Sequence, residues 1–429
     1  MRYNRAMLDI KFIREFPDLV RDAITKKHLT LNLDELLALD SSIAAKKRQT
    51  EDFQAEANRV AKEIPQASAQ TRPDLIQRGK DSKAALTTLE PELRELEAQL
   101  KVLIYQVPQI PWDGAPIGPD ESSNLETLKV GVPREFNFTP LDHVALLEKN
   151  RWSQTERMAR IAGTRSYSLR GDLALLEMSL LRFAVDFMVE RGFELITVPS
   201  SAREEAFYAH GQFPSARDQV YAIEGEDRFL AGTAEVLLNS LHSGELLEET
   251  DLPKMYVSIS PCFRAEAGAA GKDTRGLMRV HQFNKVEQYV LAPSDKNKSD
   301  QLFETLLGNS RGILEALELP YRLLETSTGD MGTGKYRMVD VESWVVSENR
   351  YRETHSCSAL HDWQARRANL RYRDGSGKPR FCFTLNNTAL ATPRILVMLL
   401  ENHQNADGTV NIPAVLQPYM NKKILESSQ

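Results

Sequence analysis

A heptad pattern from Leu36 onward restricts the first quarter of the chain to long helices. One set of positions recurs every seven residues and a second set follows three residues later, as in the a and d positions of a coiled coil. With a few polar exceptions these positions are apolar: Leu36, Leu39, Ile43, Lys46, Thr50, Phe53, Ala57, Val60 and Ile64. After a break at Pro65 to Pro73, steps of four and three from Leu75 to Val107 predict a second, antiparallel helix. At about 1.5 Å per residue, the pair forms a rod about 40 Å long.

Two roles remain open for this hairpin. A rod of this kind is ordinarily an interaction or dimerisation element. Outward-facing cations gather toward its distal half and turn: Lys47, Arg48, Arg59, Lys62, Arg72, Arg78, Lys80 and Lys83. A basic tip is what contact with a phosphate backbone requires, although charges on a rod are usually a solvated face. Pro91 lies inside the second helix, where it should remove a hydrogen bond and kink the rod.

Composition excludes several classes of protein. The chain has 429 residues, 41% hydrophobic and 27% charged, which is typical of globular domains. The 54 Lys and Arg against 60 Asp and Glu leave a net charge of −6, so the whole molecule offers no electrostatic reason to bind nucleic acid. Three cysteines without a C-x-x-C pair suggest neither a disulfide framework nor a structural zinc site. With no signal-peptide or membrane-spanning stretch, we expect a cytoplasmic protein.

The remaining chain predicts a mixed α+β fold with a largely antiparallel sheet. We expect an N-terminal domain over 1–108, a proline-rich linker over 109–140 and a second domain over 141–429. In the second domain, Asp172 is predicted to cap an apolar helix that runs to Arg191. The predicted strands are 193–199, 254–266, 278–291, 337–346 and 350–358.

Two apparent motifs do not carry the chemistry. Residues 329–335 match the spacing of a phosphate-binding loop, but Tyr336 replaces the Mg²⁺-binding hydroxyl and a strand pattern follows. A glycine-rich turn between strands is the better interpretation. Cys357 near His355 and His361 invites a thiol-nucleophile interpretation, which we reject because no orienting partner is identifiable.

Two predicted strands hold an unusual density of charge. With period-two alternation, Arg264 and Glu266 share a face of the first strand. On the second strand one face carries Arg279, His281, Phe283, Lys285 and Glu287, and the other carries Val286 and Val290. Such a row faces either solvent or a cleft. In a cleft, Phe283 could stack a flat base while Glu287, about 13 Å away, takes an ammonium group.

Two further segments suggest a phosphate and metal site. Thr392 and Pro393 are predicted as the cap and first residue of a helix, which puts Arg394 in the first turn, where an anion would favour it. Alternatively, the Arg394 side chain only extends into solvent and binds no anion. Glu353 and Ser356 are oxygen ligands that could hold Mg²⁺ on a triphosphate. Because they are three residues apart, both can bind the ion only if the strand ends or bulges between them.

In combination these segments are recognisable. FRAEAG (263–268), GLMRVHQFNKVE (276–287), RETHSCS (352–358) and an arginine at a helix start, behind a long helical hairpin, strongly resemble class II aminoacyl-tRNA synthetases. Among these, they resemble the seryl-tRNA synthetase family. The resemblance implies an antiparallel catalytic domain with an N-terminal coiled-coil hairpin. It also implies an ATP-dependent ligase that makes seryl-adenylate and transfers serine to serine tRNA, and to selenocysteine tRNA where an organism has one.

The resemblance also implies site residues. Arg264 and Arg394 would be the catalytic arginines, and Glu353 and Ser356 the Mg²⁺ ligands. The implied ATP contacts are Arg264, Ala265, Glu266, Val280, Phe283, Glu353, Thr354, His355, Ser356 and Arg394. The implied L-serine contacts are Thr233, Ala234, Glu235, Arg264, Glu287, Asn386 and Thr388. The helix from Asp172 would form a homodimer interface, and the hairpin would bind serine tRNA.

This chain departs from the family pattern in two places. Ala265 stands where many members have serine, and NNTALATPR (386–394) stands where many bacterial members have NGSGLAVGR. The second motif keeps a hydroxyl at Thr388, so the implied chemistry survives. Two alternatives remain: a paralogue that charges a carrier protein instead of tRNA, and a non-catalytic coiled-coil adaptor. A charging assay with tRNA separates the first from a synthetase, and absence of ATP binding would identify the second.

Overall fold

The computed structural model describes residues 9–268, 271, 273 and 275–428. The chain divides into two compact units. One comprises Leu8–Thr25 and Leu29–Pro108, and the other comprises Met1–Met7, Lys26–His28 and Gln109–Gln429. We call them the hairpin unit and the catalytic unit and describe each by itself.

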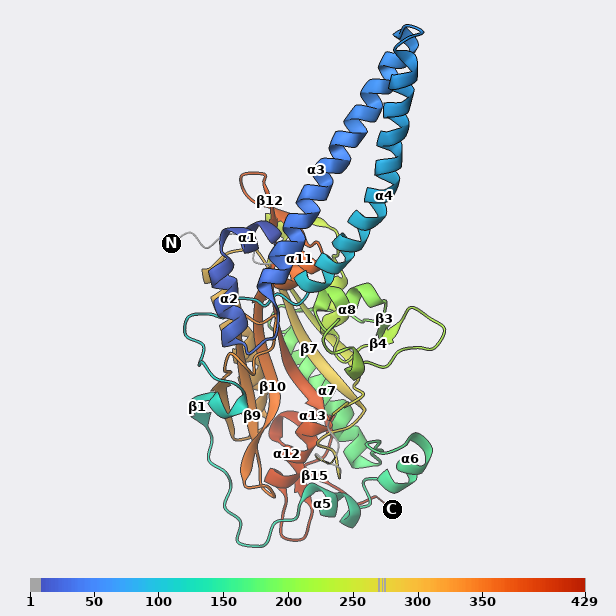
Figure 1. Ribbon diagram of the computed structural model, residues 1–429. Coiled ribbons are helices and arrows are strands. Elements are labelled where there is room, and N and C mark those ends of the chain that lie inside the picture. Colours follow the sequence, from blue (N-terminus) through green and yellow to red (C-terminus); the bar gives the residue numbers. More distant parts are fainter. Residues whose placement is uncertain (1–8, 269–270, 272, 274, 429) are drawn as a thin grey trace. The chain divides into compact units, whose positions relative to one another are not determined.

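The hairpin unit is dominated by two long helices that run side by side (Figure 1). They are α3 (Leu33–Glu63) and α4 (Arg72–Ile104), which confirms the predicted coiled-coil hairpin. Their backbones approach closely at Gly79, where an added Cβ would lie 3.3 Å from a methyl group of Val60. The short helices α1 (Ile10–Glu15) and α2 (Pro17–Lys26) precede the pair. Helix α4 continues through Pro91, although proline cannot donate the helical hydrogen bond at that position.

The catalytic unit contains an eight-stranded sheet in the order β1-β8-β9-β10-β13-β7-β6-β2. Neighbouring strands are antiparallel except β2 and β6, which are parallel. The predicted α+β class is therefore confirmed. In chain order the strands are β1 (Leu125–Val130), β2 (Glu194–Leu195), β6 (Lys254–Phe263), β7 (Gln282–Ala292), β8 (Tyr321–Glu325), β9 (Arg337–Val345), β10 (Arg350–His361) and β13 (Phe383–Thr392). Strand β1 lies within the segment that we expect to be a linker.

Side-chain parity along β7 separates the two faces of the sheet. Val286 and Val290 join the main core, which is covered by α7 (Asp172–Val189), α10 (Lys296–Ala316) and α12 (Arg394–His403). On the opposite face, Tyr289 and Leu291 pack in a second cluster with α9 (Glu235–Ser240) and α11 (Trp363–Arg367). The predicted alternation of β7 is correct. The odd-numbered residues that do not pack in the second cluster, Phe283 and Lys285 among them, face a pocket.

The remaining elements are short and surround this sheet. They are α5 (His143–Lys149), α6 (Thr155–Ala162), α8 (Glu204–His210), α13 (Gln417–Met420), β3 (Ser201–Ala202), β4 (Phe229–Leu230), β5 (Leu246–Glu248), β11 (Arg371–Arg373), β12 (Pro379–Phe381), β14 (Val410–Asn411) and β15 (Ile424–Leu425). Within the described part of the chain, we find no helix with the length and apolar character needed to span a bilayer.

Several predicted element boundaries are wrong. Gly171, not Asp172, precedes α7, and the Asp172 carboxylate instead accepts hydrogen bonds from Lys422 Nζ and the Glu426 N–H. Thr392 is the last residue of β13, and its hydroxyl donates to Glu177 Oε1 at 2.6 Å rather than capping α12. The predicted strand 193–199 is regular only over β2. In each case a tertiary partner outweighs the local preference.

Candidate active site

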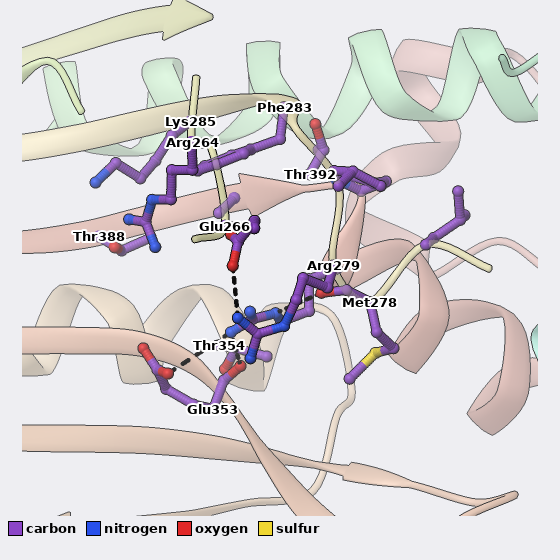
Figure 2. Close-up of a pocket in the computed structure, with 15 residues that line it drawn as sticks. Arg264, Glu266, Met278, Arg279, Phe283, Lys285, Glu353, Thr354, Thr388 and Thr392 are labelled. Atoms are coloured by element: carbon purple, nitrogen blue, oxygen red, sulfur yellow. Dashed lines mark hydrogen bonds and ion pairs between the residues drawn. The ribbon is translucent and has the colours of Figure 1, made fainter. Parts of the chain in front are cut away.

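One pocket of the catalytic unit collects residues from β7, β10, β13, the start of α12 and the segment between β6 and β7 (Figure 2). Its lining consists of Arg264, Glu266, Leu277, Met278, Arg279, Val280, Phe283, Lys285, Glu353, Thr354, Thr388, Ala391, Thr392, Pro393 and Arg394. Eight of the residues predicted for ATP or serine are among them: Arg264, Glu266, Val280, Phe283, Glu353, Thr354, Thr388 and Arg394. Residues from 264–266, 277–283, 353–354 and 388–394, far apart in the sequence, therefore meet here.

Arginine side chains dominate the electrostatics of the pocket. The Arg264 guanidinium lies 5.3 Å from the Phe283 ring centroid. Arg394 donates to the carbonyl oxygens of Glu353 at 2.8 Å and Met278 at 3.4 Å. Burial, opposed in part by Glu353 and reinforced by the charges of Arg264, Arg352 and Arg279, lowers the pKa of Arg394 from its ordinary value. A guanidinium stays charged despite such a shift, so this cluster favours a multiply charged anion.

The backbone leaves strand geometry at Glu266. Strand β6 ends at Phe263, so the predicted strand 254–266 is too long and alternation does not place Arg264 and Glu266 on one face. Glu266 has a φ of +52°, in the left-handed region that L residues seldom adopt. Its carboxylate accepts a hydrogen bond from Arg279 at 2.6 Å, drawn as a dashed line in Figure 2. A turn, not a strand, therefore brings Glu266 into the pocket.

Strand β7 places an aromatic ring, a cation and a carboxylate on its pocket-side face. Phe283 and Lys285 line the pocket, and Figure 2 shows Lys285 and Arg264 extending in the same direction. Lys285 and Glu287 are only 7% and 2% exposed, and their charged atoms are 2.5 Å apart. The charged row therefore faces a cleft, not solvent. We did not predict a role for Lys285, although its place between Phe283 and Glu287 on the same face was visible in the sequence.

The surroundings of Glu287 act on the pKa of its carboxyl group in opposite directions. Burial raises the pKa of its carboxyl group above the ordinary value, the charge of Lys285 lowers it, and the charge of Glu235 raises it. Thr388 lies directly opposite Glu287 in the pairing of β13 with β7. Directly paired residues of antiparallel strands have neighbouring side chains. A carboxylate and a hydroxyl thus lie side by side next to the pocket.

Strand β10 contains an irregularity between Glu353 and His355, where its register with β9 shifts by one residue. Glu353 pairs with Glu342 and Ser356 pairs with Asp340, and these two partners are two residues apart on β9. Glu353 and Ser356 therefore share a face, as the predicted bulge requires. The bulge residue, Thr354, lines the pocket.

Oxygen atoms on this face suit a hard cation such as Mg²⁺. Asp340 is hydrogen-bonded to Ser356, and its Oδ1 is buried without a hydrogen-bond partner in the described part of the chain. Burial, followed by the charge of Glu353, raises the pKa of Asp340 well above its ordinary value. No cluster of three or more His, Cys, Asp or Glu able to hold a metal occurs among the described residues. Mg²⁺ commonly uses one or two carboxylates together with phosphate oxygens, so Glu353 and Ser356 fit it.

The segment of Thr233, Ala234 and Glu235 is buried but does not line this pocket. Glu235 Oε1 accepts from Gln364 Nε2 at 2.8 Å, and Oε2 lies 3.1 Å from His210 Nε2. Burial opposes ionisation of Glu235, but the charges of His210 and Lys335 lower the pKa of its carboxyl well below the ordinary value. The network fixes the start of α9 and thereby the position of Thr233.

Other predicted contacts also lie outside the pocket lining: Ala265, Glu287, His355, Ser356 and Asn386. Asn386 is buried and pairs with Tyr289 in the register of β13 and β7. His355 is buried, which lowers its pKa to about 4. Glu287 is linked to the pocket through Lys285, and Ser356 through the bulge.

The two rejected motifs behave as expected. Residues 329–335 form a turn between β8 and β9, not a phosphate loop before a helix. Cys357 is buried, which raises its thiol pKa well above the ordinary value and makes it a poor nucleophile. The arginine at position 366, in α11, is only partly exposed. Arg366 pairs with Asp362 at 2.8 Å and lies over the Phe381 ring.

Comparisons with known proteins cover both units. The family model described as "Seryl-tRNA synthetase N-terminal domain" matches residues 7–111, and "tRNA synthetase class II core domain (G, H, P, S and T)" matches residues 220–403. A serine–tRNA ligase of Deinococcus radiodurans is 54% identical over 96% of this chain and 97% of its own length. One from Symbiobacterium thermophilum is 40% identical over 96% of this chain and 98% of its own.

Solved structures match over nearly the full length. The seryl-tRNA synthetase of Pyrococcus horikoshii complexed with ATP superimposes with a TM-score of 0.91 at 36% identity, covering 99% of this chain and 100% of the other. A cytoplasmic serine–tRNA ligase of Naegleria fowleri in complex with AMP gives 0.86 at 30% identity, with the same coverage of both chains.

Proposed function

Because this chain belongs to the seryl-tRNA synthetase family and is an ATP-dependent ligase that joins serine to its tRNA, we propose that ATP binds in the arginine-lined pocket, with serine beside Glu287. The observation that carries this assignment is the convergence of Arg264, Arg394, Phe283 and Glu353 on a single cavity. Two cations, an aromatic ring and an oxygen ligand are what a nucleoside triphosphate requires.

We propose the following roles toward ATP. Phe283 stacks on the adenine, and Arg264, which lies above the same ring, reaches the α-phosphate. Arg394, at the N-terminal end of α12, faces the γ-phosphate, where the helix dipole also favours an anion. Glu353 and Ser356 would hold Mg²⁺, which when bound neutralises phosphate charge. The Glu266 carboxylate, oriented by Arg279, is placed to accept a hydrogen bond from the base.

Serine is proposed to bind where β7 and β13 pair. Glu287 takes the ammonium group and Thr388 the side-chain hydroxyl, with Thr233, Ala234, Glu235 and Asn386 closing the site. We add Lys285 to the predicted set because it lines the pocket and is paired with Glu287. Its cation, together with Arg264, can hold the serine carboxylate. Alanine is then disfavoured because polar groups lose their partner, and threonine by its additional methyl group.

The two reaction steps need positioning and charge stabilisation from the protein. The serine carboxylate oxygen attacks the α-phosphorus of ATP, the bond to the bridging oxygen breaks, and pyrophosphate leaves with that electron pair. A hydroxyl of the tRNA 3′ end then attacks the carbonyl carbon of the adenylate, its proton passes to the departing phosphate, and AMP leaves with the electron pair of the broken acyl carbon–oxygen bond. Arg264 and Arg394 stabilise the charge that develops on the phosphate oxygens. The protein provides this stabilisation without forming a covalent bond to either substrate.

The hairpin unit is proposed to bind serine tRNA, and the catalytic unit to form a homodimer through α7. Cations on α3 and α4 supply the phosphate contacts that the net charge of −6 does not. Leu175 and Met178, one turn apart on α7, are 52% and 68% exposed, which favours a protein contact there. Since Cys262, Cys357 and Cys382 are all free thiols, we also propose a cytoplasmic location.

The site assignment is tested by serine-dependent ATP–pyrophosphate exchange. Arg394→Ala removes a charge that acts on the phosphates, and we expect exchange to fall at least about 100-fold. Glu287→Ala should abolish exchange because the ammonium group loses its counter-charge. Arg373→Ala, at the exposed last residue of β11, is the control and should behave like the parent protein. Near-normal exchange in both site variants would overturn the assignment.

A further inference from the structure

A buried carboxylate in the catalytic unit lies outside the proposed contacts with ATP and serine. Glu401, on α12, is 0% exposed. Its Oε1 accepts hydrogen bonds from the His143 N–H at 2.9 Å and from Ser347 Oγ at 3.0 Å. Its Oε2 accepts from the Ser347 N–H at 2.9 Å. Glu401 thus joins the start of α5 to the turn between β9 and β10.

The imidazole of His143 lies between this carboxylate and the segment that precedes β7. Nδ1 is 3.0 Å from Glu401 Oε1, and Nε2 is 3.3 Å from the Leu277 backbone nitrogen. A carboxylate that already receives donors needs a proton on Nδ1, and a backbone N–H needs a lone pair on Nε2. Both contacts therefore select the same form of the ring, neutral with its proton on Nδ1.

The chain beside His143 is built for this close approach. Gly276 has a φ of +74°, and an added Cβ would lie 2.0 Å from His143 Nε2. Glycine is the residue that accepts this backbone conformation and leaves room for the ring. The imidazole consequently packs directly against the backbone at 276–277.

The same stretch of backbone reaches the pocket immediately afterwards. Leu277 and Met278 line it, the Met278 carbonyl accepts from Arg394 Nε at 3.4 Å, and Arg279 orients Glu266. Thus the peptide group that His143 holds is adjacent to those that locate one cation and one carboxylate of the pocket. His143 itself does not line the pocket.

We propose that His143, oriented by Glu401, is a positioning residue for the ATP subsite, acting through the Leu277 N–H on the segment 276–280. The chain of contacts runs from Glu401 through His143 to Leu277, and from there to Met278, Arg279 and their partners. This inference rests on the proposed assignment of the pocket to ATP. It adds a determinant of ATP binding that makes no contact with the nucleotide.

Two substitutions test the two hydrogen bonds of the imidazole one at a time. In His143→Asn the amide nitrogen can replace the Nδ1 donor toward Glu401, but nothing reaches Leu277. In His143→Gln the amide oxygen can replace the Nε2 acceptor, but the donor to Glu401 is lost. The measurements are KM for ATP, KM for serine and kcat in ATP–pyrophosphate exchange, together with the melting temperature.

We expect His143→Asn to raise KM for ATP about three- to tenfold, the effect of one hydrogen bond. KM for serine and kcat should stay within about twofold, and the melting temperature should fall because the buried Leu277 N–H loses its partner. His143→Gln should leave KM for ATP within about twofold and also lower the melting temperature, because the carboxylate of Glu401 loses a partner. Since both variants lose stability, a rise of KM for ATP in only one of them is not produced by a general loss of stability.

Two matched variants complete the test. Ser347→Ala removes the Oγ donor to Glu401, keeps the backbone N–H donor and does not touch Leu277, so it should lower stability while KM for ATP stays unchanged. His403→Gln alters a histidine of α12 that makes no contact with Leu277; its Nε2 lies 3.0 Å from the Leu317 carbonyl, and KM for ATP should stay unchanged. Equal KM changes in the Asn and Gln variants of His143, or none in either, would overturn the proposal. If Arg394→Ala also leaves KM for ATP unchanged, the ATP assignment itself fails.

Discussion

The pair Lys285 and Glu287 has the charge pattern of an amino acid in reverse. Free serine carries an ammonium and a carboxylate group, and the pair offers a carboxylate and an ammonium group in a nearly solvent-free place. Replacing the internal ion pair by two pairs with the substrate keeps every buried charge compensated. An uncompensated buried charge would be costly. A substrate lacking either charge would leave one partner unsatisfied.

A pH profile tests this pair through Lys285→Met. Glu287 must be ionised to bind the ammonium group, and its pKa is raised by burial, so kcat/KM for serine should fall as the pH drops through this raised pKa. Lys285 lowers that pKa. Its removal should therefore shift the acid limb to higher pH and reduce kcat/KM for serine about 10- to 100-fold. Lys298→Met, on the exposed side of α10, should leave the profile in place.

An unshifted acid limb in Lys285→Met would show that Lys285 does not act on the charge of Glu287. A loss of kcat/KM that is equal at all pH values would point to carboxylate binding alone.

At this scale, residue chemistry predicted part of the site. The face shared by Phe283 and Glu287 follows from period-two alternation and is correct. The same rule was wrong for Glu266, because β6 ends at Phe263 and the next residues form a turn held by Arg279. Local sequence does not contain the partner that stabilises a left-handed residue. The role of His143 was equally inaccessible, since its partners lie more than 100 positions away along the chain.

Among the elements, the bulge in β10 was foreseen from a chemical requirement and not from propensity. Two proposed metal ligands three residues apart need a register shift, and the structure has one between Glu353 and His355. The hairpin was predicted from its heptads because α3 and α4 are two regular helices that pack on each other. The cap of α12 was predicted wrongly, since Thr392 is bound by Glu177 of another element.

An ion pair between the two helices of the hairpin shows where the hairpin can be shortened. Lys46 of α3 pairs with Glu92 of α4, so removing residues 47–92 and closing with a short turn leaves Leu33–Lys46 opposite Leu93–Ile104. We expect serine-dependent pyrophosphate exchange within about twofold of the parent, because the catalytic unit is unchanged. Aminoacylation of serine tRNA should fall at least about 100-fold through the loss of phosphate contacts.

Both reactions are measured on the same preparation. Replacing residues 47–92 by a hairpin of equal length with neutral residues in place of its outward cations separates length from charge. Equal loss of exchange and aminoacylation in the truncated protein would contradict a dedicated tRNA element.

For the whole molecule, global charge and local surface give different information. A net charge of −6 predicts no affinity for nucleic acid, yet outward cations lie on both α3 and α4 toward the turn of the hairpin. Three exposed apolar side chains, Leu175, Met178 and Val189, lie on the single helix α7. Composition averages over such features, which is why it could not indicate the proposed tRNA contact or the proposed dimer.

The proposed dimer is tested by charge on α7. Leu175→Glu with Met178→Glu places two carboxylates on the exposed apolar face and should convert the protein from dimer to monomer in sedimentation experiments, with an unchanged circular dichroism spectrum. Val132→Glu, at an exposed apolar residue outside α7, is the control and should stay dimeric. A parent protein that sediments as a monomer, or a double variant that remains dimeric, would contradict an interface at α7.

The place of β13 in the sheet has a consequence for synthesis of the chain. This strand lies between β10 and β7, yet it is the last of the eight to be translated. Lys46 and Glu92 in the hairpin are 46 positions apart, whereas Gln288 and Thr388 in the sheet are 100 apart. The nascent hairpin can therefore form early, whereas one edge of β7 and one edge of β10 stay unpaired until β13 has been synthesised. Unpaired edges invite aggregation, so chaperone dependence should centre on the ribosome-bound chain before residue 383.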